Sequence, residues 1–243
     1  MADETRAGIG SYIGELILKP LPDGRLMQLM APFGFQDAQQ KKWPVPKGTK
    51  VDGASIPQVL WTLIGGPFEG KYREASVVHD FYCDTRTEPW KAVHRVFYEG
   101  MLVSGVSGIR AKLMYAAVRY AGPHWADSTV DNNRLARNGG LSTLTRHPPT
   151  AFALGVRQAV TAAPAQPGHK VFTNSRNARP AARETTLDLD QLEALIAAEN
   201  PSLDDIDEAL DDATRLLEAP AGIPAPAATR TLKAQAGYAR LAE

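Results

Sequence analysis

Cysteine and long apolar runs are the two clearest absences in this 243-residue sequence. A single cysteine, Cys83, cannot form a disulfide within the chain, so a disulfide-stapled secreted scaffold is excluded. No apolar run approaches the roughly 18–20 residues that a membrane-spanning helix needs. The first ten residues, MADETRAGIG, lack the basic start and apolar core of a signal peptide. We therefore expect a cytoplasmic protein, or one built into a particle that is assembled in the cytoplasm.

Aromatic residues are scarce in the second half of the chain, and the charges are unevenly divided. All four tryptophans and 15 of the 18 aromatic residues precede residue 126, which predicts that the main core lies there. Residues 1–109 carry 12 basic and 12 acidic groups, residues 110–183 carry 11 and 2, and residues 184–243 carry 4 and 13. These divisions predict a head domain (1–125), a basic extended segment (126–183) and an acidic tail (184–243).

The first fifty residues show the period of β-strands. Residues 12–18 alternate apolar and polar side chains, Pro22-Asp23-Gly24 supplies a turn, and residues 25–30 continue the pattern, which predicts a β-hairpin. Pro44 restricts the next extended piece to a sheet edge or a loop, because proline cannot donate to a central ladder. A short strand is expected at residues 48–51.

Apolar stripes at helical spacing follow the strands and predict helices over residues 69–83, 88–104 and 107–121. The expected fold class is α+β, with a small antiparallel sheet packed on a helical hairpin plus a third helix. An extended tail follows, carrying two short amphipathic helices over residues 187–199 and 203–218.

The last of these helices has a narrow apolar seam, and a seam of this kind needs a covering surface. Either it folds back on the head, or it docks on another subunit of a large assembly. The second alternative makes the seam a partner-binding site formed by Leu203, Ile206, Leu210 and Leu217.

Two histidines are placed to meet across the helical hairpin. The midpoint of the connection, near Arg86, is equally distant from His79 and His94, so antiparallel helices bring both residues to a similar height. Two imidazoles with the carboxylate of Asp80 suit a divalent transition metal ion that keeps one position open for water and acidifies it for hydrolysis. Asp52 is a further candidate ligand, and Tyr82 is a candidate proton donor.

Simpler interpretations compete with a metal site. A histidine on an apolar helix face is often a hydrogen-bonded core residue, and an adjacent aspartate often pairs with arginine. Cys83 follows His79 by one helical turn, as in a thiol and base pair, but a buried bystander explains it equally simply. The basic set that includes Arg119 and Arg157 would attract phosphate, as in nucleic acid, or an acidic partner. A solvated face and the chain's own acidic end are simpler explanations.

Several motifs together resemble a known family. The sequence VDGASIP at residues 51–57, Trp61, ASVVHDFY at residues 75–82 and MYAAVR at residues 114–119 are similar to the uncharacterised bacterial and phage family called domain of unknown function 1353. The resemblance covers about residues 10–125 and implies a phage or prophage setting but no activity. An acidic residue is commoner in the family where His94 stands. A more distant likeness is to phospholipase A2, whose helix also carries adjacent His and Asp residues, although its calcium loop and disulfides are missing here.

Two functions are therefore expected from the sequence. The first is a phage-derived virion or assembly component whose head docks on neighbouring subunits through its long tail. The alternative is a metal-assisted hydrolase, acting on a lipid or cell-envelope substrate, in which His79, Asp80 and Tyr82 carry the reaction.

Overall fold

The computed structural model describes residues 8–52, 70–125, 150–161, 171–173 and 186–218. Within these ranges the chain forms small three-stranded antiparallel sheets and several helices, which confirms the predicted α+β class. None of the described helices is long and apolar enough to cross a membrane.

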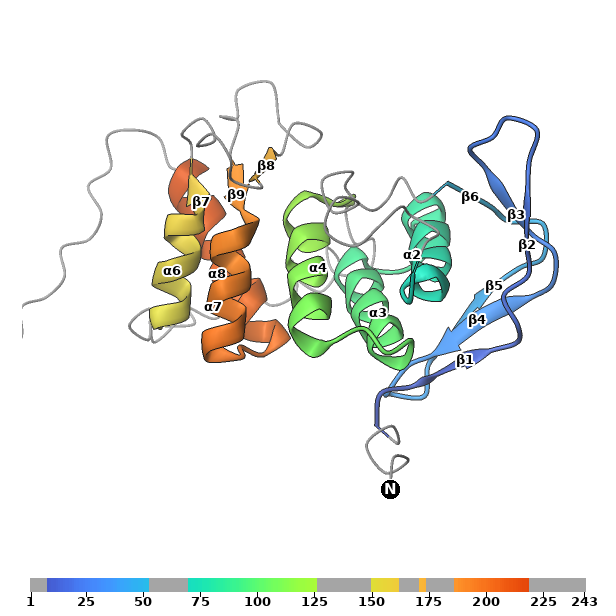
Figure 1. Cartoon of the computed structure of the whole chain (residues 1–243), viewed down its shortest axis with the longest axis horizontal. Coiled ribbons are helices and arrows are strands. Elements are labelled where there is room, and N and C mark those ends of the chain that lie inside the picture. Colours follow the sequence, from blue (N-terminus) through green and yellow to red (C-terminus); the bar gives the residue numbers. More distant parts are fainter. Residues whose placement is uncertain (1–7, 53–69, 126–149, 162–170, 174–185, 219–243) are drawn as a thin grey trace, which may run out of the picture.

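Two sheets stand at the N-terminal end of the molecule (Figure 1). In the first, β1 pairs with β4 and β4 with β5; in the second, β2 pairs with β3 and β3 with β6. The strands are β1 (Ser11–Ile13), β2 (Leu18–Pro20), β3 (Met27–Leu29), β4 (Phe33–Gln36), β5 (Lys42–Val45) and β6 (Lys50–Val51). Pro44 lies in β5 at the edge of its sheet, as predicted.

The predicted hairpin is confirmed only in its second half. Leu18 pairs with Leu29 across a turn in which the Asp23 carboxylate accepts from two backbone amides. Residues 12 and 13 pair instead with β4. The cause is Gly14, which has φ of 81° and whose position leaves no room for a Cβ, because that atom would lie 2.9 Å from the Pro32 carbonyl oxygen.

Within the described ranges, a group of helices follows the sheets, and a second group lies beyond it (Figure 1). The predicted helices are found with small shifts at their ends. The helices are α2 (Arg73–Thr85), α3 (Trp90–Val103), α4 (Gly108–Ala121), α6 (Ala151–Ala159), α7 (Leu189–Glu199) and α8 (Leu203–Glu218), and a third small sheet has the order β7 (Val160–Thr161), β9 (Thr186–Asp188), β8 (Val171–Thr173).

Residues 126–183 were predicted to form an extended segment, but helix α6 lies within this range. Thr150 caps the helix by accepting from the Ala153 amide, and Phe152 and Val156 are buried one turn apart. Nine residues are too few for a sustained period, which is why the sequence pattern concealed the helix.

Helix α4 lies between α3 on one side and the C-terminal helices on the other (Figure 1). Ten of its residues are buried. Side chains of α4, α6, α7 and α8 share one hydrophobic core, while the sheets and α2 form a second core around Trp43 and Phe35. The head and the C-terminal helices are therefore packed together.

A close approach of α2 and α3 depends on Gly100. A Cβ at this position would lie 3.0 Å from both the Ala75 Cβ and the Tyr12 hydroxyl oxygen. We expect Gly100→Leu to lower the free energy of unfolding by about 1–3 kcal/mol, because the larger side chain overpacks the contact. Urea unfolding measures this loss. Gly108→Leu is the control, since nothing lies within 4 Å of that position, and an equal loss in both variants would contradict the packing argument.

Candidate functional site

Helices α2 and α3 form the hairpin on which the candidate site is built. Arg86 ends α2 in the left-handed conformation, with φ of 53°, and its amide donates to the Tyr82 carbonyl. Pro89 precedes α3, where the missing amide proton costs nothing. The two helices pack side by side, so residues at similar distances from this turn face each other.

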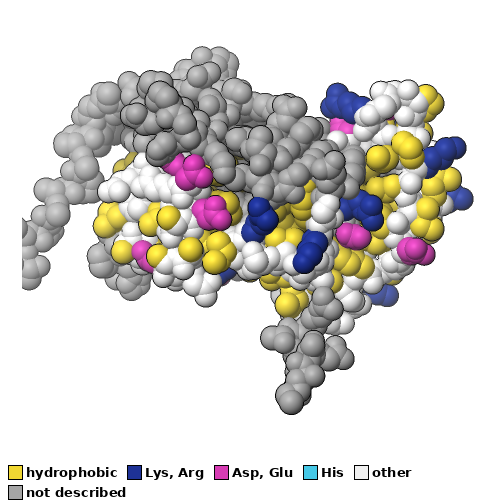
Figure 2. Space-filling view, viewed as in Figure 1, with side chains coloured by type: hydrophobic (Ala, Val, Ile, Leu, Met, Phe, Trp, Pro, Cys, Tyr) yellow, Lys and Arg dark blue, Asp and Glu magenta, His cyan; other side chains and the backbone are white. Residues whose placement is uncertain are grey.

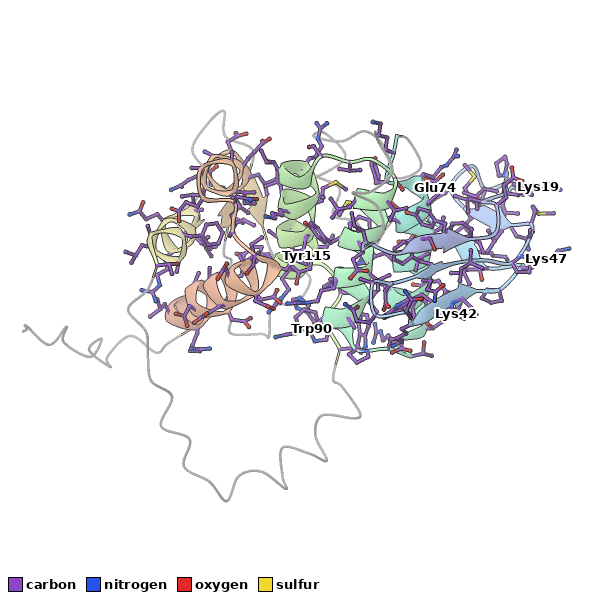
Figure 3. All side chains as sticks on the ribbon, turned by 90° about the horizontal axis from the view of Figure 1, so that it is seen from below. Lys19, Lys42, Lys47, Glu74, Trp90 and Tyr115 are labelled. Carbon is purple, nitrogen blue, oxygen red and sulfur yellow. The ribbon has the colours of Figure 1, made fainter. Side chains whose placement is uncertain are left out.

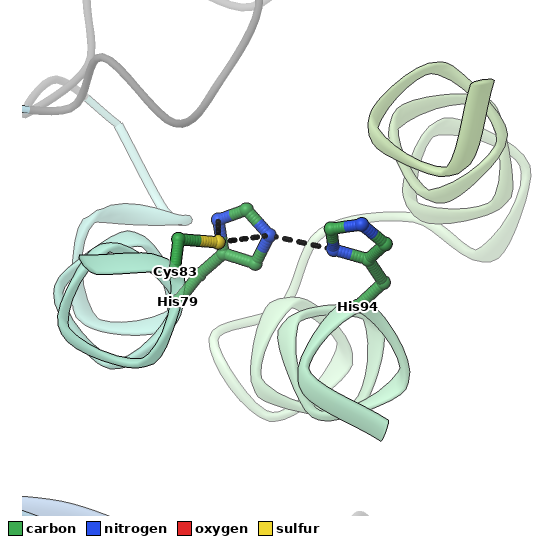
Figure 4. Close-up of side chains that lie close together, drawn as sticks. All are labelled: His79, Cys83 and His94. Atoms are coloured by element: carbon green, nitrogen blue, oxygen red, sulfur yellow. Dashed lines mark hydrogen bonds between the residues drawn. The ribbon is translucent and has the colours of Figure 1, made fainter. Parts of the chain in front are cut away.

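His79 and His94 meet between the helices, as the spacing predicted (Figure 4). The Nε2 atom of His79 lies 2.9 Å from Nδ1 of His94, which is a hydrogen bond in which one nitrogen donates and the other accepts. Both side chains are fully buried. No histidine of the described residues is visible on the face drawn in Figure 2.

Cys83 joins the histidine pair from the next turn of α2. Its Sγ atom lies 3.6 Å from Nε2 and 3.8 Å from Nδ1 of His79. One ligand atom from each of the three residues lies within 4.8 Å of the others. Sequence reasoning noted the spacing of four residues but did not include the thiol among the metal ligands. The signal was present, because residues i and i+4 share one helix face.

The surroundings of the cluster are aromatic and apolar. The Phe97 ring centre lies 4.8 Å from that of His79, and the Trp90 ring centre lies 5.5 Å from that of His94. Burial lowers the pKa of His79 to about 3. Burial also holds the pKa of His94 well below its usual value, with smaller effects in the same direction from His79, His124 and Arg119 and an opposing effect from the Pro123 carbonyl. Both imidazoles are therefore neutral at pH 7.

Three residues predicted for the site stand apart from this cluster. Asp80 is buried but is not among the three residues whose ligand atoms converge, because adjacent helix positions point in different directions. Asp52 forms an ion pair with Arg25 at 2.7 Å. The Tyr82 hydroxyl donates to the Pro44 carbonyl at 3.1 Å, and burial raises its pKa to about 12. The structure thus brings His79 and His94 together with Cys83, and it does not bring Asp80 or Asp52 into the same group.

The apolar seam of α8 is covered by the chain itself, which contradicts its prediction as a docking surface for another subunit. Ile206 and Leu210 are 1% and 2% exposed, and Leu203 packs against the same core, so the chain's own helices cover these residues. Leu217 lies in the last turn of α8, where its side chain is outside the described part of the chain. The fold-back alternative is the one that the structure contains.

The acidic face of α8 meets basic residues of α4 and α6. Arg119 donates to Asp207 at 2.9 Å and to Asp211 at 2.6 Å, and Arg157 of α6 donates to Asp212 at 3.0 Å. For these two arginines the chain's own acidic end is the partner, as the simpler interpretation held. Three further arginines of the predicted basic set, Arg134, Arg137 and Arg146, lie outside the described residues.

Comparison with known proteins confirms the family resemblance over the head. Residues 27–118 match the family described as "Protein of unknown function (DUF1353)". The uncharacterised protein y4jT of Sinorhizobium fredii is 52% identical over 110 residues, which is 45% of this chain and 33% of that protein. The uncharacterised protein y4iH of the same organism is 44% identical over 115 residues, covering 47% and 48% of the two chains. The chain thus spans half or less of these relatives, and no solved structure matches it significantly.

Proposed function

We propose that this protein binds one divalent transition metal ion at His79, Cys83 and His94 and uses the ion for hydrolysis. The observation that carries the proposal is the convergence of two imidazole nitrogens and one thiol sulfur, all buried, from facing turns of two helices. Nitrogen and sulfur donors suit zinc, cobalt or copper, whereas calcium and magnesium require oxygen ligands.

Two of the three distances between donor atoms are close to those that such an ion needs, and the third, between Cys83 and His94, lies within 4.8 Å. Bonds of about 2.0–2.1 Å to nitrogen and about 2.3 Å to sulfur put tetrahedral ligand atoms roughly 3.3–3.7 Å apart. The Sγ of Cys83 is 3.6 Å from Nε2 of His79, and the 2.9 Å between the two imidazoles would open by a few tenths of an ångström. Binding requires the shared imidazole proton to move to another ring nitrogen and the thiol proton to pass to solvent.

A metal centre explains the cluster better than a thiol nucleophile does. A cysteine activated by a neighbouring base needs an imidazolium beside the thiolate. The lowered pKa values of His79 and His94 disfavour that charged ring, while neutral imidazoles are the form that binds metal.

A hydrolytic role is the one that three protein ligands favour. Three protein donors leave one position of a tetrahedral ion for water, and zinc lowers the pKa of bound water to about 7, which supplies hydroxide at neutral pH. The substrate classes to be tested are phospholipids and cell-envelope polymers, which the phospholipase A2 likeness and the phage setting of the family suggest. The virion or assembly role stays a prediction, and the seam on which it depended is internal.

The metal content of the full-length chain tests this proposal. We expect about one equivalent of zinc or cobalt by elemental mass spectrometry after reconstitution and dialysis, and a thiolate-to-cobalt absorption band in the near ultraviolet. His94→Ala should lose the ion, and Cys83→Ser should lose the absorption band. Hydrolysis of phospholipid vesicles and of cell-wall fragments should depend on the added ion.

Asp52→Asn is the matched control, because Asp52 pairs with Arg25 in the structure and should leave the metal content unchanged. Circular dichroism of each variant separates loss of the ion from loss of folding. Negligible metal in the folded wild-type chain, or equal metal in the wild type and in folded His94→Ala, would overturn the assignment.

A further inference from the structure

Trp90 forms a contact between the candidate metal site and the outer part of the molecule. One neighbour is His94, with ring centres 5.5 Å apart. The guanidinium carbon of Arg119 lies 4.5 Å from the Trp90 ring centre, close enough for a cation–π interaction. His124 also contacts Trp90, with ring centres 4.2 Å apart, and its Nε2 is 2.9 Å from the Arg119 carbonyl oxygen. Trp90 therefore contacts both His94, a residue of the candidate metal site, and Arg119.

Arg119 is in turn held by the C-terminal helix α8. It is only 5% exposed, and its Nε and one terminal nitrogen donate to Asp207 and Asp211. Asp207 also accepts from the Tyr115 hydroxyl at 2.7 Å and from Arg95 at 2.9 Å. Tyr115, which is labelled in Figure 3, therefore lies next to α8. A buried, charge-assisted arrangement of this kind leaves the guanidinium little freedom.

From these contacts we infer that α8 orients the His94 imidazole through Arg119 and Trp90, so that Arg119 is a positioning residue for the metal site. This inference rests on the proposed metal-binding function. The physical reason is that the rotamer of a ligand side chain is fixed by what packs on it, and an indole that is itself held by Arg119 and His124 restricts how the imidazole turns. If Arg119 no longer holds Trp90, the His94 ring is free to turn away from His79.

Helix α8, which lies beyond the family match, would therefore have a role at the candidate metal site. That match ends at residue 118, immediately before Arg119. Both carboxylates that hold Arg119 come from residues 203–218, which form α8. Helix α8 would thus help to position a site whose candidate ligands all belong to the shared segment.

A pair of charge-matched double variants of the full-length chain tests the inference. Asp207→Asn with Asp211→Asn releases Arg119. Asp204→Asn with Asp212→Asn removes two carboxylates of the same helix that bind Arg95 and Arg157 instead. We expect the first variant to bind Co²⁺ on the order of 3- to 30-fold more weakly, measured by competition with a chromophoric chelator, and to shift the visible cobalt bands. The control should bind Co²⁺ within about twofold of the wild type.

Arg119→Lys provides a second test of the coupling if the first double variant does not fold. It keeps the positive charge but loses the planar contact with Trp90, and it should weaken Co²⁺ binding and shift the cobalt bands in the same direction. Wild-type affinity and spectrum in the Asp207 and Asp211 variant, or equal weakening in both double variants, would overturn the coupling. Failure of the wild-type chain to bind Co²⁺ would instead overturn the proposed function.

Discussion

Replacement of Phe97 by alanine is expected to lower the free energy of unfolding by about 3–5 kcal/mol. Phe97 is fully buried, belongs to the core shared with the C-terminal helices and lies against the ring of His79. Truncation removes its buried apolar surface and leaves a cavity beside the histidine pair, which the surrounding helices fill only in part. Urea unfolding of the metal-free protein measures the loss, with an unchanged m value showing that unfolding remains two-state.

Phe81→Ala is the matched control for this prediction. Phe81 precedes Tyr82 in α2 and is only partly buried, so its truncation should cost less than about 2 kcal/mol. Losses of similar size in the two variants would show that Phe97 is not at the centre of the core.

Acidification is expected to destabilise the metal-free protein before its carboxylates are protonated. The folded chain keeps His79 neutral down to a pKa of about 3, whereas the unfolded chain protonates it near pH 6.5. Between these values the unfolded state binds more protons, so stability is present above pH 6.5 and is lost as the pH falls. His79 alone should reduce the free energy of unfolding by about 2–3 kcal/mol between pH 6.5 and 4.5. His94 adds to the loss in the same direction.

Urea unfolding at a series of pH values, with a chelator present, measures this dependence. His79→Gln is the control, because glutamine does not titrate and the carboxylates of both proteins are the same. The difference between the two slopes isolates the histidine. Equal slopes would mean that His79 binds protons equally in the folded and unfolded states, contrary to the effect expected of its burial.

Much of the candidate site could be predicted from the sequence because helix geometry is regular. Equal spacing of His79 and His94 from Arg86 was enough to predict that they meet. The two predicted carboxylates lie outside the cluster for local reasons that the sequence pattern does not contain. Asp52 has Arg25 as its ion-pair partner across the second sheet, and Asp80 occupies a neighbouring direction on α2. Cys83 was on the correct face, but a thiol at that spacing is equally common in ordinary cores.

The position of the C-terminal helices could not be read from their apolar seam. The seam of α8 requires a covering surface but does not identify it, because leucine and isoleucine pack on any apolar partner. The charges carried more information. Asp207 and Asp211, one turn apart, match Arg119 on α4, and this complementarity distinguishes folding back from docking elsewhere. Such a match is visible only when helices far apart in the sequence are compared face by face.

The shared use of α4 has a consequence for how the protein comes apart. Because α4 contributes to packing on both of its sides, neither half can open without exposing buried side chains of the other. Its backbone amides should therefore exchange with solvent only when the whole molecule unfolds, and the C-terminal helices should melt together with the head rather than before it. The segment that the family shares and the helices that follow it would then unfold as a single cooperative unit, so that a substitution destabilising either one would destabilise both.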